Sequence, residues 1–124
     1  MLEATTAGVA ITNNQYVDMC SVALTKGLWL VSSIVTVSGA SLVGTRILTG
    51  ISTSSGNAFA DLSTQAGNAT DSPTIPTNAA NESFTIANYK VYLSADTTYY
   101  LKCYVAFSSG SGSCIGRITA VRIA

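Results

Sequence analysis

The chain closes with the stretch YYLKCYVAFSSGSGSCIGRITAVRIA, Tyr99 to Ala124, and this stretch decides the fold class. Aromatic and β-branched residues flank a glycine–serine segment on both sides, a pattern typical of two β-strands joined by a turn. With Ser108 to Ser113 as the turn, the register predicts a hairpin in which Phe107 lies opposite Cys114. One face of this hairpin is apolar, and the other carries tyrosines and cations.

Two of the three cysteines lie on the apolar face in this register. Cys103 and Cys114 are then two cross-strand pairs apart, about 13 Å along the strand direction. Because a disulfide needs Cα atoms within about 7 Å, we expect no bond between them. Together with Cys20 they are predicted to be small buried hydrophobic residues in a reducing cytoplasm.

Similar segments recur through the rest of the chain. Stretches rich in Val, Ile, Thr, Tyr and Leu alternate with Gly, Asn, Ser and Asp, and none has a helical period. We predict an all-β fold: a single-domain antiparallel β-sandwich over residues 1–124, jelly-roll-like, with seven to eight strands. The expected strands are residues 8–12, 16–24, 28–37, 43–51, 84–93, 97–107 and 114–123.

The segment from residue 52 to residue 83 interrupts the strand pattern. It contains both prolines and four of the seven asparagines, and it is predicted to be one long loop. Loops of this length in compact domains usually have a function or are held by a partner. Phe59, Leu62 and Ile75 indicate that parts of the loop are anchored by apolar contacts.

The strand from Leu28 to Val37 is apolar on both faces. One parity contains Trp29, Val31, Val35 and Val37, and the other contains Leu28, Leu30 and Ile34. A sandwich strand needs only one buried face, because the other normally meets water. The second apolar face predicts a homodimer or homotrimer, and the alternative is a scattered exposed residue of the ordinary kind.

Composition excludes several classes of partner. Charged residues make up only 10% of the chain, while Ser and Thr contribute 32 residues. The six basic and six acidic residues cancel and are scattered, which argues against binding to nucleic acid or to an anionic membrane surface. The longest apolar run, residues 27–37, is about half the length that a membrane-spanning helix needs.

The sequence lacks the residues of most catalytic sites. It contains no histidine, which removes the commonest general base and the commonest metal ligand. Its carboxylates are isolated along the chain, so a carboxylate pair of the glycosidase kind is only a minor alternative. GSGSCIG, Gly110 to Gly116, joins two predicted strands rather than a strand and a helix, so it is no phosphate loop. We predict no catalytic residue, no metal and no cofactor.

Three motifs resemble a family of bacteriophage virion β-domains. The closing stretch from Ser94 to Ala124 resembles that family in its aromatic strand, its small-residue tip and its final Gly-Arg-Ile-x-Ala-x-Arg strand. LTKGLWLVSSIVTVSG, Leu24 to Gly39, resembles the family's Leu-Thr-x-Gly-x-Trp strand, and ILTGISTSS, Ile47 to Ser55, its Gly-Ile-Ser-Thr segment. The resemblance implies a self-assembling β-sandwich that decorates or cements a capsid or forms the tip of a tail fibre, and it supplies no catalytic residues.

Two functions follow from the resemblance. The first predicted strand begins about seven residues from Met1, so if the chain is complete it has no fibre shaft. This favours a head decoration (cement) protein that binds the major capsid protein in the virion, which is assembled in the bacterial host cytoplasm. If Met1 to Glu3 were added by cloning, the fibre tip has equal weight. In that alternative, residues 52–83 and tyrosines such as Tyr89 and Tyr92 would recognise a host glycan or protein.

Three residues are candidate contacts with a partner. Lys102, Tyr104 and Arg117 share the non-core face of the predicted hairpin, where Tyr104 lies opposite Arg117 and could stack on it. A simply solvated face is the alternative interpretation.

Overall fold

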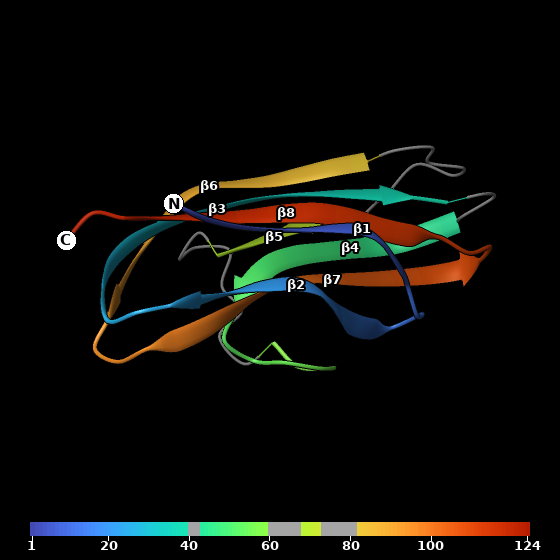
Figure 1. Ribbon diagram of the computed structural model, residues 1–124. Helices are drawn as coiled ribbons and strands as arrows, with labels where there is room; N and C mark the ends of the chain where they lie inside the picture. The colour runs from blue at the N-terminus through green and yellow to red at the C-terminus, as the bar shows by residue number, and fades with distance from the viewer. Residues whose placement is uncertain (40–42, 60–67, 73–81) are drawn as a thin grey trace.

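The computed structural model describes residues 1–39, 43–59, 68–72 and 82–124, and these residues contain strands and connections but no helix (Figure 1). The strands form two antiparallel sheets that pack against each other, which confirms the predicted all-β sandwich. The strands are β1 (Leu2–Ala10), β2 (Gln15–Leu24), β3 (Gly27–Ser38), β4 (Val43–Ser52), β5 (Ala69–Ser72), β6 (Glu82–Leu93), β7 (Thr97–Ser109) and β8 (Ser113–Arg122).

The order of the strands is that of a jelly roll. Sheet A has the order β1-β8-β3-β6, and sheet B has the order β2-β7-β4-β5. β1 pairs with β8, β2 with β7, β3 with β6 and β4 with β5, so the chain is arranged as one long antiparallel ribbon rolled over itself. Consecutive strands therefore alternate between the sheets, except for β4 and β5, which pair directly.

The core lies between the sheets and follows the two-residue period of the strands. On β3, Trp29, Val31, Val35 and Val37 face inward, and Val31 and Val35 have no exposed surface. Leu101 on β7 meets them from sheet B and is also fully buried. Burying an aliphatic side chain of this size stabilises a protein by about 1.5–3 kcal/mol, so this inward parity holds the sheets together.

The predicted closing hairpin is wrong in its pairing, although both of its strands are present. β7 pairs with β2 and β4, whereas β8 pairs with β1 and β3 in the other sheet. The residues between Ser109 and Ser113 lead from one sheet to the other, and Gly110 adopts a φ of 88° there. Four peptide steps reach about 13 Å, enough to cross the roughly 10 Å between packed sheets.

Because β7 and β8 do not form a hairpin, the predicted separation of Cys103 and Cys114 does not hold. Cys103 and Cys114 point into the core from opposite sheets, and their Sγ atoms are 2.8 Å apart. Both side chains are fully buried, as predicted, while Cys20 is half-buried. All three cysteines are free thiols in this structure.

The first strand begins earlier than predicted. β1 starts at Leu2 rather than at Gly8, because residues from Leu2 to Thr6 pair with β8, with Leu2 opposite Ala120. The register shifts between Thr6 and Val9 and then resumes. This part of the chain lacks clear alternation of apolar and polar residues, and its partner strand is what makes it extended.

The predicted loop over residues 52–83 contains strand β5. The Thr49 and Thr70 hydroxyls, opposite each other on β4 and β5, form a 2.6 Å hydrogen bond. Phe59 is half-buried and packs on Tyr16, with ring centroids 5.6 Å apart, so this part of the segment is anchored as predicted. Leu62 and Ile75 lie outside the described residues.

Candidate functional site

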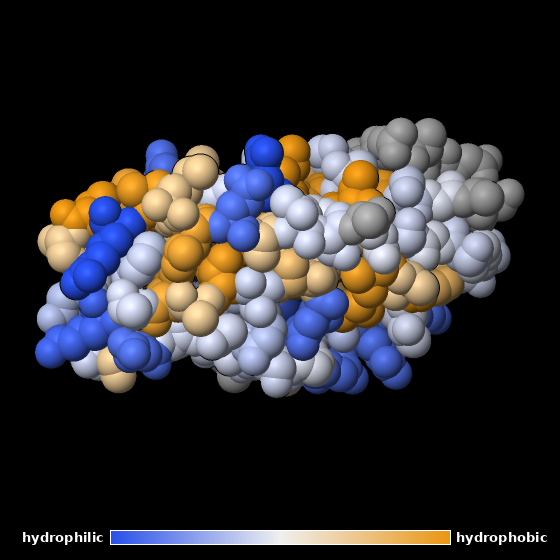
Figure 2. Space-filling model, in the orientation of Figure 1, coloured by the Kyte–Doolittle hydropathy of each residue, from blue (hydrophilic) through white to orange (hydrophobic). Residues whose placement is uncertain are grey.

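The outer faces of the two sheets differ in the apolar surface that they leave exposed. In the part of the chain that the structure describes, every large hydrophobic side chain that is well exposed belongs to sheet A or to the chain ends beside it. Figure 2 shows such hydrophobic groups interspersed with polar ones on the visible side of the molecule. These exposed residues are Met1, Leu2, Ile34, Tyr92, Ile115, Val121 and Ile123.

We call the outer side of sheet A the open face, and it is defined by Ile34, Thr36, Ile115, Arg117 and Val121. The pairing of β3 with β8 sets their arrangement: Ile34 lies opposite Arg117, and Thr36 lies opposite Ile115. The inward neighbours of these residues fill the core, so strand alternation directs these five side chains away from it.

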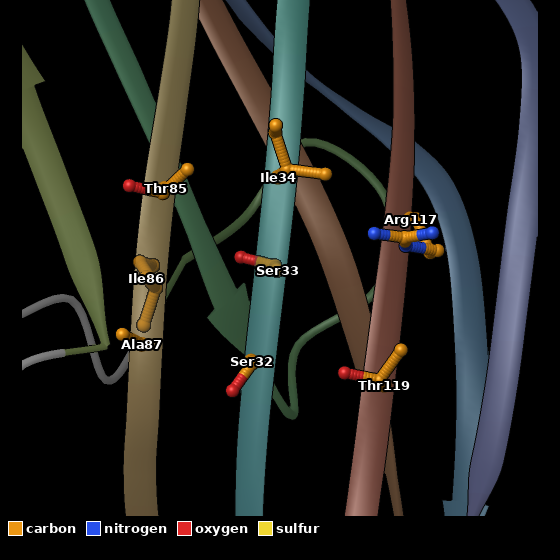
Figure 3. A pocket seen from close by; sticks show the side chains of 8 residues that line it. All are labelled: Ser32, Ser33, Ile34, Thr85, Ile86, Ala87, Arg117 and Thr119. Atoms are coloured by element: carbon orange, nitrogen blue, oxygen red, sulfur yellow. The ribbon is translucent and has the colours of Figure 1, made fainter.

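Two shallow depressions lie on the open face. Figure 3 shows the first, of about 270 Å³, with Ile34 and Arg117 toward one end and Ser32 and Thr119 at the other. Its β6 side is formed by Thr85, Ile86 and Ala87. The second, of about 310 Å³, lies toward β1 and again has Ile34 and Arg117 in its lining. Both are open hollows lined by methyl groups and hydroxyls rather than enclosed substrate cavities.

The chemistry of the open face suits contact with another protein surface. Its apolar residues are aliphatic and separate, and the exposed Arg117 guanidinium lies among them. Arginine is enriched at protein interfaces, where its guanidinium can donate several hydrogen bonds, and the buried centre of an interface is more apolar than the rest of the surface. The remaining positions are mostly hydroxyl side chains, which can form hydrogen bonds at the edge of such an interface.

The outer side of sheet B, here called the closed face, is partly covered by the protein itself, although Ser21 and Ala23 on β2 remain exposed. Lys102 on β7 has no exposed surface, because residues 53–59 lie over it. Its Nζ forms an ion pair with Asp18 Oδ1 and donates a 2.8 Å hydrogen bond to the Gly56 carbonyl. The Gly56 amide in turn donates to Asp18 Oδ2 at 2.7 Å. The Lys102–Asp18 pair therefore binds both the carbonyl and the amide of Gly56 and holds residues 53–59, here called the loop, in place.

Aromatic rings complete the closed face. Tyr16 lies between Phe59 and Tyr104, with ring centroids 5.6 and 4.9 Å away. Burial, followed by the neighbouring Tyr104, raises the pKa of Tyr16 above its usual 10.0. The Tyr104 hydroxyl donates a 3.2 Å hydrogen bond to Asn14, and Asn14 itself has a φ of 60°.

The structure separates the three predicted contact residues. Lys102 and Tyr104 lie on sheet B, whereas Arg117 lies on sheet A, so the shared face on which the prediction rested does not exist. Lys102 is buried under residues 53–59, and Tyr104 packs on Tyr16, so neither lies beside Arg117 as the predicted hairpin required. Arg117 alone is exposed, on the open face.

Sequence reasoning overlooked Ile115 and Val121 as candidate contacts. Both lie on the outward side of β8, on either side of Arg117, which is the one residue of this strand that the sequence prediction named as a contact. The signal was present in the alternation of CIGRITAV, in which Cys114, Ile118 and Ala120 are buried and the residues between them are outward.

The described residues contain no candidate metal site. Residues 1–39, 43–59, 68–72 and 82–124 include no cluster of three or more His, Cys, Asp or Glu side chains that could hold a metal ion. In the same residues, no helix is long and apolar enough to cross a membrane.

Comparison with known proteins identifies a shared fold. No family model and no curated protein matches the sequence. The chain is similar to a chain in the structure of infectious bursal disease virus Gx strain, with a TM-score of 0.59 and 12% identity, over 96% of this chain and 31% of that one. A chain of the Gt strain structure gives the same TM-score, identity and coverage of this chain, and 30% of its own length is covered. The protein thus spans about a third of the chains that it matches, and at 12% identity the similarity shows the β-sandwich fold alone.

Proposed function

We propose that this protein is a non-enzymatic structural component of a virion, of the bacteriophage head decoration (cement) type, and that its open face binds the capsid surface. The observation that carries the proposal is the confinement of the well-exposed large hydrophobic residues, within the described chain, to sheet A and the adjoining ends. The sandwich thus has one outer face that is partly covered and another that is partly apolar. Association through the apolar face removes the most apolar surface from water.

Two further observations support a virion role. The sequence motifs resemble bacteriophage virion β-domains, and the chains that share the fold belong to structures of a virus. The low charge of the chain, with six basic and six acidic residues, suits close packing against a shell better than long-range attraction to a charged partner.

The mechanism is stabilisation by mass action. A protein that binds only the assembled shell stabilises it by RT ln(1 + [L]/Kd), which is about 3 kcal/mol at a hundredfold excess over Kd. A stable contact needs about 800 Å² from each partner. Self-association into a dimer or trimer, predicted from the second apolar parity of β3, must leave part of the open face free. Several copies would then contact the shell at once, so that weak single contacts add up.

A binding experiment with a matched pair of variants tests this proposal. Purified protein is mixed with undecorated capsids of the parent phage, and the bound fraction is measured by sedimentation. Val121→Asp places a charge on the open face, and Ala23→Asp places the same charge on an exposed position of β2 in sheet B. We expect at least a tenfold loss of capsid binding for Val121→Asp and no change for Ala23→Asp. Equal binding by both variants, or no binding by the parent protein, would refute the proposal.

The second candidate is the receptor-binding tip of a tail fibre or spike, and one observation favours it. Tyr92, on β6, is 68% exposed, which suits it to stack on a sugar or protein. Tyr89, the other tyrosine assigned to this role, instead packs partly buried against the core. A parallel experiment offers the purified protein to host cells. Retention on the cells but not on capsids, abolished by Tyr92→Ser, would replace decoration by receptor binding.

A further inference from the structure

Two buried cysteines from opposite sheets meet inside the sandwich. Cys103 is on β7, between β2 and β4, and Cys114 is on β8, between β1 and β3. Their sulfur atoms are 2.8 Å apart, and both side chains are fully buried. Each thiol therefore belongs to an inner strand of its own sheet, and a covalent bond between them would join the middles of the two sheets.

We propose that Cys103 and Cys114 form an intersheet disulfide when the protein meets a low-molecular-weight disulfide such as oxidised glutathione. One cysteine gives up its proton and attacks the small disulfide, which releases one thiol and leaves a mixed disulfide. The second cysteine gives up its proton and attacks the protein sulfur of that mixed disulfide, which releases a second thiol. Two protons and two electrons pass from the protein to the small molecule. The inference is independent of the proposed function.

The fold prepares this pair and excludes the third cysteine. The backbone around both cysteines is fixed by sheet pairing, with Cys103 opposite Thr49 and Cys114 opposite Val37. To form the bond, the two sulfur atoms must move from 2.8 Å to about 2.05 Å apart, while sheet pairing holds the backbone on both sides. Cys20 lies apart, with its Sγ directed at the Ala4 carbonyl at 3.5 Å, and it serves as an internal control.

Burial makes the reaction slow in the folded protein. The hydrogen bond with Cys114, together with burial, raises the pKa of Cys103 well above its usual 9.0. Since the attacking species is the thiolate, few molecules react while the sandwich is closed. We expect the bond to form at least tenfold faster during refolding from urea in oxidised glutathione than in the folded protein.

The tryptic cleavage sites allow the Cys103–Cys114 bond to be detected directly. Lys102 and Arg117 bracket both cysteines, so trypsin releases residues 103–117 as one peptide, and Cys20 is released in a separate peptide. The wild-type protein is refolded with oxidised glutathione, alkylated under denaturing conditions and digested. We expect peptide 103–117 to carry no alkyl group and to lack two hydrogens, whereas the Cys20 peptide carries an alkyl group or a glutathione. Cleavage after Phe107 should leave the two halves of peptide 103–117 joined.

Two results would overturn the proposal. One is the recovery of alkyl groups or glutathione on both Cys103 and Cys114 after refolding, and the other is a bond from Cys20 to either of them. Stability is the second readout: the oxidised protein should melt about 10 °C above the reduced protein, because the bond restricts the unfolded chain. The difference should persist in Cys20→Ser and vanish in the Cys103→Ala, Cys114→Ala double variant.

Discussion

The outer faces of the two sheets differ in how far their side chains are covered by the rest of the protein. Sheet B covers itself with residues 53–59, which bury Lys102 beneath a backbone held by Asp18. Sheet A has no such cover among the described residues, and Ile34, Ile115 and Val121 remain exposed on it. The closed face is built of paired polar groups, whereas the open face offers unpaired aliphatic groups around one guanidinium.

The two faces therefore depend on their own contacts to different degrees. A buried lysine costs free energy unless an anion and hydrogen-bond acceptors accompany it, so the closed face is stable only as a complete network. The open face needs no such network for folding, because its side chains are exposed to water. Changes on the closed face should therefore alter stability, and changes on the open face should alter association.

The ion pair under the loop should give the largest change in stability. Asp18→Asn leaves the Lys102 ammonium buried without its counter-charge, and we expect a loss of about 3 kcal/mol in the free energy of unfolding. The double variant Asp18→Asn, Lys102→Met removes the charge as well and should lose less than the single variant. Urea unfolding of the three proteins measures this, and a loss below about 1 kcal/mol for Asp18→Asn would mean that the pair does not hold the loop.

A glycine beneath the loop should give the next largest change. A Cβ added at Gly50 would lie 2.5 Å from the Phe59 ring and 2.6 Å from the Asn68 carbonyl oxygen, so Gly50→Ala must displace both. We expect a cost of about 2 kcal/mol from this overpacking. Gly8→Ala on β1 is the matched control, because the nearest atom to its new Cβ is 3.8 Å away, on Ile115. Equal thermal stability of the two variants would contradict the tight packing of the closed face.

Alkaline pH should weaken the closed face through Tyr16. Burial raises the pKa of Tyr16 in the folded protein above the 10.0 of the unfolded chain. Below pH 10 both states keep the proton and stability is complete; as pH rises further, the unfolded chain ionises first and stability falls. Urea midpoints at pH 8 and pH 11 should therefore differ more for the parent protein than for Tyr16→Phe. An equal difference in both proteins would exclude Tyr16 as the source.

The exposed ion pair at the rim of the closed face should matter least. Arg46 donates two hydrogen bonds to Asp71, at 2.9 and 3.1 Å, but both side chains remain accessible to water. Since water screens such a pair, Asp71→Asn should leave the urea midpoint unchanged within error. A clear destabilisation would show that β5 depends on this pair as strongly as the loop depends on Asp18.

Local pattern predicted the strands well and their partners poorly. The ranges expected for β2, β3, β4 and β6 agree with the structure to within one or two residues, because each has clear alternation or a dense β-branched run. β5 was missed because its four residues, Ala69 to Ser72, carry no such signal and are extended only by pairing with β4.

The candidate site shows the same limit. Arg117 was predicted to be outward and is exposed, because alternation along a single strand is a local property. Lys102 was assigned to the same face and is instead buried under residues 53–59, which are remote in sequence. The spacing of residues along the sequence does not indicate that Asp18 and Gly56 both contact Lys102.

The fold class, the positions of most strands and the inward parity of residues such as Val31 and Val35 follow from the sequence alone, because they depend on a two-residue period within each strand. In contrast, the assignment of β7 and β8 to different sheets appears only in the folded molecule. That assignment brings Cys103 against Cys114 and places Lys102 and Arg117 on opposite sides. The physical reason is that sheet pairing is non-local: a short glycine–serine link can close a hairpin or cross a sandwich, and the choice depends on which strands elsewhere in the chain offer partners.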